Sequence, residues 1–255
     1  MAVYQDKAAD RIKNGLRKFS ALIEKAVDAK MQESDTRKIV MRVLTDLLGW
    51  DEFENLTGEY AIKGSYADLV LKNNGDNLAV IEVKQVGLNL NEKHLRQAKD
   101  YAVNEGIEWV YLTNGNVWKI YHIVFVKNVP DAKHVFTVQI NDPDMKPAKK
   151  TDLLYLLSEE AFRKNELNDY YERRIALSGE NLANRILSND VLDRIRIGIK
   201  ASSGHKVTNA ELAEVIIDRV LCNEVKPLDC EKIIKQIDTS ENKQAKKPKA
   251  NGFQQ

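Results

Sequence analysis

Apolar and polar residues follow two different periods along this chain. Up to residue 48, apolar residues recur every three or four positions, within residues 1–30 and again within residues 33–48. This spacing predicts two amphipathic helices. Gly49 is expected to end the second helix, because glycine commonly follows the last helical turn.

From residue 57 the apolar residues fall into short runs rich in branched and aromatic side chains, a pattern typical of strands. A polar turn at residues 73–77 and the dipeptide Asn114-Gly115 each predict a hairpin, and a helical pattern at about residues 91–106 lies between them. We expect strands at residues 59–62, 67–71, 78–83, 109–113 and 117–122, with a further edge strand at 135–140. Strands interleaved with helices predict an α/β domain built on a mixed sheet flanked by helices.

The later part of the chain has a different composition. Residues 141–150 contain two prolines and no periodicity, which indicates a linker. Residues 151–238 show helical periodicity throughout, and residues 239–255 hold several lysines among polar residues, as in a disordered tail. The predicted organisation is an N-terminal helix (1–30), an α/β core (31–140), the linker, a small all-helical domain and the tail.

Charge and composition exclude several classes of protein. The 255 residues carry 39 basic and 38 acidic side chains, so any basic surface for nucleic acid must be local. Two cysteines, Cys222 and Cys230, are too few for a zinc site or a disulfide scaffold. No apolar run reaches the roughly 18 residues of a membrane span, the N-terminus lacks a signal-peptide pattern, and no phosphate-binding loop of a motor ATPase occurs. A cytoplasmic protein without a membrane partner is expected.

The residues with the most informative chemistry lie on the first predicted hairpin. Glu82 and Lys84 are two positions apart on one strand, so their side chains point to the same face. A hairpin that turns symmetrically about Gly75 would place Asp68 directly opposite Glu82. Two opposed carboxylates repel each other, and a hard divalent cation such as Mg²⁺ removes that repulsion. Lys84 would then lie beside the metal.

Each of these signals also has an ordinary structural explanation. The tripeptide Glu82-Val83-Lys84 alone is common and fits a neighbouring ion pair on a half-exposed sheet. Glu33 lies two helical turns before Val40, so a carboxylate extends an otherwise apolar stripe. The opposed Asp68 and this Glu33 make a metal site and an ordinary ion pair about equally plausible.

In combination, the motifs resemble the PD-(D/E)xK nuclease superfamily. They are Ala67-Asp68, Glu82-Val83-Lys84 after thirteen intervening residues, and Gln97-x-x-x-Tyr101 on the next helix. The similarity is greatest to the N-terminal nuclease domain of type I restriction enzyme R subunits and covers about residues 30–125. Further similar stretches are Glu33-Ser-Asp-Thr-Arg37, Leu47-Leu-Gly-Trp50, Tyr66-Ala-Asp-Leu-Val-Leu71 and Leu112-Thr-Asn-Gly-Asn-Val-Trp-Lys-Ile-Tyr121. Ala67 stands where the motif has a proline, and the motor that follows this domain in R subunits is absent here.

The resemblance implies a restriction-endonuclease-like fold and a Mg²⁺-dependent endonuclease that hydrolyses DNA phosphodiesters. It implies that Asp68 and Glu82 bind Mg²⁺, for which Mn²⁺ can substitute, with help from the Val83 carbonyl and from Glu33. Lys84 would orient the attacking water and help to deprotonate it.

The same resemblance implies that Gln97 and Tyr101 position the DNA backbone or support Lys84. Expected partners are DNA and other restriction or defence subunits. Residues 151–238 carry 16 acidic and 13 basic side chains, which favours protein contacts, including a homo-oligomer, over a grip on DNA. Two alternatives remain: a catalytically idle module of the same fold that binds nucleic acid or a partner protein, and a purely structural assembly protein.

Overall fold

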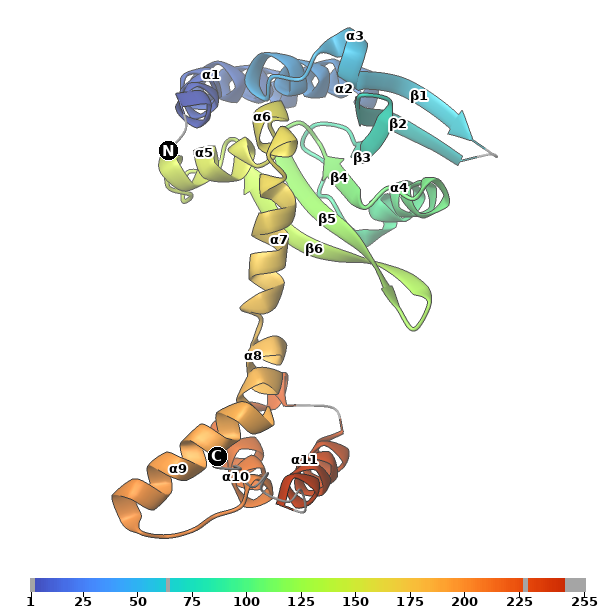
Figure 1. The fold of residues 1–255 in the computed structure, drawn as a ribbon. Coiled ribbons are helices and arrows are strands. Elements are labelled where there is room, and N and C mark those ends of the chain that lie inside the picture. Colours follow the sequence, from blue (N-terminus) through green and yellow to red (C-terminus); the bar gives the residue numbers. More distant parts are fainter. Residues whose placement is uncertain (1–2, 63–64, 227–228, 246–255) are drawn as a thin grey trace, which may run out of the picture. The chain divides into compact units, whose positions relative to one another are not determined.

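The computed structural model describes residues 3–62, 65–226 and 229–245. The chain divides into two compact units, Met1–Asp169 and Tyr170–Gln255, which we call the first and the second unit. The first unit contains the sheet, and the second is helical throughout its described residues (Figure 1).

The first unit is built on one six-stranded mixed sheet in which neighbouring strands follow the chain order. Only β3 and β4 pair in parallel, and α4 (Glu92–Glu105) connects them, while the other neighbours are antiparallel. The strands are β1 (Leu56–Ile62), β2 (Ser65–Asn73), β3 (Asp76–Val83), β4 (Trp109–Thr113), β5 (Val117–Val126) and β6 (Val129–Gln139). The predicted α/β architecture is therefore confirmed, with β5 and β6 longer than their apolar runs indicated.

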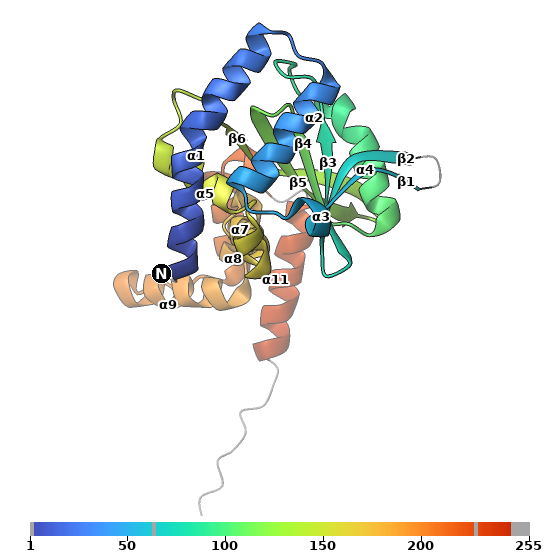
Figure 2. The ribbon, with the colours of Figure 1, turned by 90° about the horizontal axis from the view of Figure 1, so that it is seen from above.

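Helices cover both faces of this sheet (Figure 2). α1 (Val3–Asp28) and α2 (Glu33–Arg42) lie on one side, and α2 continues as a π-helical turn, Val43–Leu47. α4 lies on the other side, where its Leu95 and Ala98 join Val80 and Val110 in one buried cluster. A short helix, α3 (Glu52–Asn55), precedes β1. Because both faces are covered, the central strands bury nearly every side chain, charged ones included.

The first unit extends well past the linker expected at residues 141–150. The indole nitrogen of Trp50 donates to the carbonyl of Leu157 at 2.9 Å, and its ring packs edge-on against Phe162. The guanidinium of Arg11 makes two hydrogen bonds, of 2.7 and 2.8 Å, to the carboxylate of Glu160. These contacts fasten α5 (Pro147–Tyr155) and α6 (Glu159–Arg163) to the N-terminal helices, so the division between units falls after Asp169.

The second unit consists of short helices around a small apolar core. Ser178 accepts a hydrogen bond from the backbone of Asn181 and starts a new helix, so the helical pattern is interrupted there. The core contains Leu187, Leu192, Ala213, Ile216, Ile217 and Ile237. The helices are α7 (Glu166–Ala176), which begins in the first unit, α8 (Gly179–Ile186), α9 (Asn189–Ser203), α10 (Asn209–Val215) with π-helical Ile216–Val220, 3₁₀-helical Asn223–Val225, and α11 (Cys230–Ala245).

α11 occupies the end of the expected helical domain and part of the expected disordered tail. Residues 246–255 of that tail lie outside the described residues. Neither Cys222 nor Cys230 forms a disulfide. In the part of the chain that the structure describes, no helix is long and apolar enough to cross a membrane.

Candidate active site

The β2–β3 hairpin has the register that brings the two carboxylates together, although it turns differently from the expectation. Asn74 and Gly75 both have positive φ and form the turn, so Asn73 pairs with Asp76. A register shift next to Leu71 then adds one residue, and Leu69 pairs with Ile81. This bulge, rather than a turn centred on Gly75, produces the register that directs Asp68 towards Glu82.

Asp68 is held at both of its carboxylate oxygens. Its Oδ2 accepts a 2.8 Å hydrogen bond from the backbone N–H of Val83, just beyond the last β2–β3 pair. Its Oδ1 accepts a 2.6 Å charged hydrogen bond from Nη2 of Arg37 on α2. A charge-assisted hydrogen bond on one oxygen and a backbone donor on the other fix the orientation of this carboxylate.

Glu82 is the most deeply buried carboxylate of the site, with only 2% of its surface exposed. Its Oε1 lies 2.6 Å from Nζ of Lys84, while its Oε2 is buried without a hydrogen-bond partner among the described residues. Burial raises the pKa of Glu82, the contact with Lys84 opposes that rise, and the charges of Asp68 and Glu33 add to it. A buried carboxylate with one unsatisfied oxygen is costly, which is typical of functional positions.

Lys84 lies between carboxylates from two elements. Its Nζ is 2.6 Å from Glu82 and 3.8 Å from Oε2 of Glu33, the first residue of α2. Burial alone would lower the pKa of Lys84, but the hydrogen bond to Glu82 and the charges of Glu82, Glu33 and Asp68 together raise it. Lys84 is therefore a cation at neutral pH in this arrangement.

The start of α2 is tied to the segment after β3 by a buried threonine. The hydroxyl of Thr36 donates to the carbonyl of Gln32 at 3.0 Å and accepts from the backbone N–H of Val86 at 2.9 Å. Thr36 is completely buried. Glu33 and Arg37 flank it on the same helix, so their backbones are fixed relative to the strand that carries Glu82 and Lys84.

The Thr113-Asn114-Gly115 turn lies next to the backbone of Lys84 and to α2. The backbone N–H of Lys84 donates to the carbonyl of Thr113 at 2.8 Å, which continues the parallel β3–β4 pairing. Asn114 is buried, and its side-chain oxygen accepts from two backbone N–H groups within the turn. Gly115 has φ of 81°, and a Cβ there would touch Thr36, so this turn packs closely against α2.

The remaining two candidate residues, Gln97 and Tyr101, lie on α4, which covers the face of β2 and β3 that carries Val70 and Val80. Tyr101 is buried in that cluster, and Gln97 is exposed on the helix surface. Their expected contact with DNA or with Lys84 stays a prediction.

Arg37 is the site residue that sequence reasoning did not assign. It lies within a stretch that resembles the nuclease family, but no role was derived for it. A signal was present, because Arg37 follows Glu33 by four residues and therefore shares its helix face. Which carboxylate it would contact depends on the packing of α2 against the sheet.

The donor set fits a hard divalent cation. Within the described residues, no three His, Cys, Asp or Glu side chains form a ready-made cluster for a metal ion. Asp68 and Glu82 nevertheless offer carboxylate oxygens on adjacent strands, and Oε2 of Glu82 is buried and has no hydrogen-bond partner among the described residues. Mg²⁺ prefers oxygen ligands and commonly takes one or two carboxylates with water.

A mixed sheet flanked by helices, with two carboxylates and a lysine where β2 and β3 part, defines a nuclease-like domain of the restriction-endonuclease-like α/β class. Comparison with protein families identifies a match over residues 32–136 to the type I restriction enzyme R protein N terminus. Residues 32–136 are thus similar to the N-terminal domain of type I R subunits, as the motifs indicated. No curated protein and no solved structure matches the chain.

Proposed function

We propose that residues 32–136 form a Mg²⁺-dependent nuclease that hydrolyses DNA phosphodiesters. The observation that carries the proposal is the carboxylate of Glu82, which is buried beside Asp68 with one oxygen unsatisfied. A fold gains no stability from such a group, because burying it costs free energy that an apolar residue would not. A role in cation binding would explain why a carboxylate is buried at this position.

In this proposal Asp68 and Glu82 hold Mg²⁺, or Mn²⁺ in its place, and Glu33 and the carbonyl of Val83 complete the ligands. The bound metal lowers the pKa of a water molecule and stabilises negative charge on the phosphate. Lys84, held as a cation, donates a hydrogen bond that orients the attacking water or a phosphate oxygen.

In this proposal the exposed side chain of Gln97 contacts the DNA backbone, and buried Tyr101 supports the helix that carries Gln97. DNA is the proposed substrate, and the family match supports other restriction or defence subunits as partners. Those subunits would supply the translocation and sequence recognition for which the chain carries no motor motif. The proposed location is the cytoplasm.

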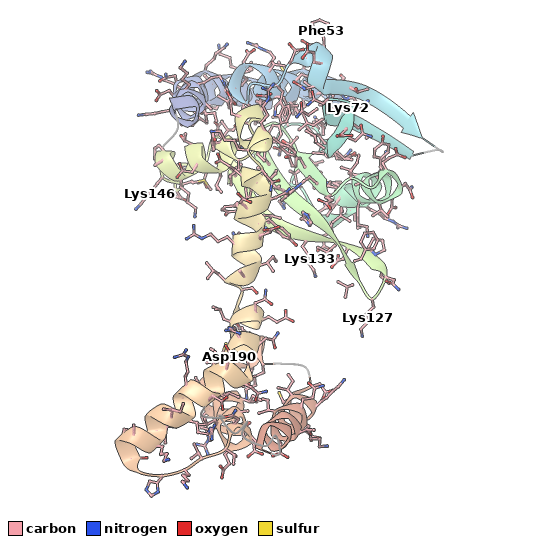
Figure 3. The ribbon with its side chains drawn as sticks, viewed as in Figure 1. Phe53, Lys72, Lys127, Lys133, Lys146 and Asp190 are labelled. Carbon is pink, nitrogen blue, oxygen red and sulfur yellow. The ribbon has the colours of Figure 1, made fainter. Side chains whose placement is uncertain are left out.

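The direct test is cleavage of supercoiled plasmid by the purified protein in Mg²⁺ and in excess chelator. Lys84→Ala should lower the cleavage rate by at least about 10²-fold, since it removes a positioning contact to the reacting groups. Lys146→Ala is the matched control, because Lys146 projects into solvent at the start of α5 (Figure 3). Equal rates for Lys84→Ala and the wild type would contradict the proposal.

One observation favours the idle module instead. Each buried carboxylate already faces a protein cation, Asp68 through Arg37 and Glu82 through Lys84. Titration calorimetry with Mn²⁺ separates the two functions. Binding by the wild type that is lost in Glu82→Gln supports the nuclease, whereas DNA binding in gel-shift experiments without cation binding or cleavage supports the idle module.

A further inference from the structure

Arg37 contacts the same carboxylate that the proposed nuclease offers to a cation. Its Nη2 lies 2.6 Å from Oδ1 of Asp68, and both side chains are largely shielded from solvent. The other oxygen of Asp68 is bonded to the backbone of Val83. The guanidinium therefore lies against the one oxygen of Asp68 that the main chain does not bind.

The helix turn that carries Arg37 is held in place by buried neighbours. Its neighbour Thr36 is buried and joins α2 to the backbone of Val86, and Ile39 and Val40 are buried in the same helix. A surface ion pair between flexible side chains contributes little and is easily lost. Here Arg37 lies on a helix turn that Thr36 fixes, and Asp68 is bonded to the backbone of Val83. The pair therefore loses less side-chain entropy when it forms than a surface pair does.

Arg37 compensates a negative charge that Lys84 alone does not. Three carboxylates, those of Glu33, Asp68 and Glu82, surround a single lysine, and Lys84 contacts only Glu33 and Glu82 directly. Without Arg37, Asp68 would add an uncompensated negative charge next to buried Glu82. The guanidinium thus supplies at Asp68 the positive charge that a divalent cation would otherwise supply.

We propose that Arg37 is a positioning residue that serves as a built-in counter-cation: it orients the carboxylate of Asp68 and competes with the divalent cation for it. The inference rests on the proposed function. It makes the metal-free site a folded, charge-compensated state. Cation binding then requires Arg37 to share or release Oδ1 of Asp68.

Orientation and competition predict opposite effects of one substitution. Removing the positive charge of Arg37 removes electrostatic repulsion against an incoming cation, so the cation should bind more tightly. Removing its hydrogen bond frees the carboxylate to rotate, so cleavage should become slower. A residue that only stabilised the fold would weaken cation binding and cleavage together.

The experiment compares Arg37→Gln and Arg37→Met with the wild type by calorimetric titration of Mn²⁺, thermal unfolding in chelator and plasmid cleavage. An adjacent guanidinium changes the proton affinity of a carboxylate by about one to three powers of ten. Both variants should therefore bind Mn²⁺ at least about tenfold more tightly and show a larger Mn²⁺-induced rise in Tm. The cleavage rate at saturating DNA should fall by about tenfold or more with KM little changed. Arg37→Lys, which keeps the charge, should restore wild-type Mn²⁺ affinity.

Arg42→Met is the matched control, because Arg42 lies on the same helix in an exposed ion pair with Asp46. It should leave Mn²⁺ affinity and cleavage unchanged. Unchanged or weaker Mn²⁺ binding in both Arg37 variants, with a wild type that binds Mn²⁺, would overturn the inference and leave the proposed nuclease standing. Binding only in the Arg37 variants would support Arg37 as the competitor and show that the wild-type site is idle. No binding by any of them would overturn both proposals.

Discussion

The first unit contains a largely buried group of charged side chains, whereas the described ion pairs of the second unit are all at least partly exposed. In the first unit, the carboxylates of Asp68 and Glu82 and the ammonium of Lys84 lie largely out of solvent and contact one another or α2. In the second unit, ion pairs stand in solvent, as between Arg185 and Asp190, whose side chains are 65% and 61% exposed. Buried charges cost free energy and surface pairs cost almost none, so only the first arrangement needs a functional reason.

Apolar residues differ less between the units, because both leave some large side chains exposed, among them Phe53 at 93% and Phe125 at 65% in the first unit. The first unit buries the whole of β4 and most of β3. The second unit has a small core and leaves Val215, Ile197 and Val220 exposed at 55%, 65% and 67%. We propose that the first unit carries the chemistry and the second makes protein contacts, and the following experiments test that division.

The largest expected effect comes from Glu82→Gln. It removes the charge of a proposed metal ligand while keeping its shape, so Mn²⁺ binding should be lost and cleavage should fall by about 10³-fold, the scale of losing a main electrostatic stabiliser. Glu180→Gln, an exposed carboxylate of the second unit, is the control and should change neither. A similar loss in both variants would mean that the effect is not specific to the buried site.

The next largest effect tests whether the units are energetically separate. Leu192 is completely buried in the core of the second unit, so Leu192→Ala should destabilise that unit by about 2–5 kcal/mol. Mn²⁺ affinity should remain at the wild-type value. Leu112→Ala, in the sheet cluster of the first unit, should cost as much but weaken Mn²⁺ binding as well. Calorimetric unfolding with and without Mn²⁺ shows whether each variant loses stability alone or Mn²⁺ affinity as well.

Shortening the chain tests where the first unit ends. A chain ending at Ala176 keeps the contacts of Arg11 and Trp50 with residues 157–162 and should retain cation binding and DNA affinity. If the second unit mediates self-association, light scattering should also show a changed oligomeric state. A chain ending at Lys150 leaves the Trp50 indole without its acceptor, which costs about 1–3 kcal/mol before the lost packing is counted. Equal thermal stability of the two shortened chains would contradict the division after Asp169.

Opposite pKa shifts predict opposite pH dependence in the two units. Burial raises the pKa of Glu82, so its contribution to metal-free stability is fully present below the ordinary glutamate pKa of 4.5 and is lost as pH rises through the raised value. Cation binding needs the ionised form, so Mn²⁺ affinity should fall as pH drops through that raised pKa, by up to about tenfold per pH unit. In the metal-free protein, the part of the pH dependence of Tm that comes from Glu82 should disappear in Glu82→Gln.

In the second unit, backbone and side-chain hydrogen bonds from Thr208 lower the pKa of Glu211. Its contribution to stability is present above the ordinary glutamate pKa and is lost as pH falls through the lowered value. Mn²⁺ titrations and thermal unfolding over a pH series follow the two groups separately. An unchanged pH dependence of the metal-free Tm in Glu82→Gln would assign the titration to another group.

The smallest effect concerns a surface pair. Arg185→Ala removes the exposed partner of Asp190 and should change stability only slightly, because exposed ion pairs contribute little. Chemical unfolding in urea measures this difference, and cleavage should not change. A larger loss would mean that the stability of the second unit depends on this ion pair.

Local patterns in the sequence determined the elements and most of the proposed site. The period of apolar residues located the strands of the first unit and its first helices, because burial of one face requires that period. The spacing of Glu82 and Lys84 placed both on one strand face, and the family match agrees with the motifs over residues 32–136. The roles assigned to those side chains are still predictions.

Only the tertiary structure decided which distant groups meet. The bulge at Leu71 sets the register of the hairpin, and no residue type marks it in advance. The pairing of Arg37 with Asp68 and the docking of residues 157–162 on Trp50 join positions 31 and more than a hundred residues apart. Helix and strand periods report which face of an element is buried, whereas the partner it finds there depends on packing of the whole chain.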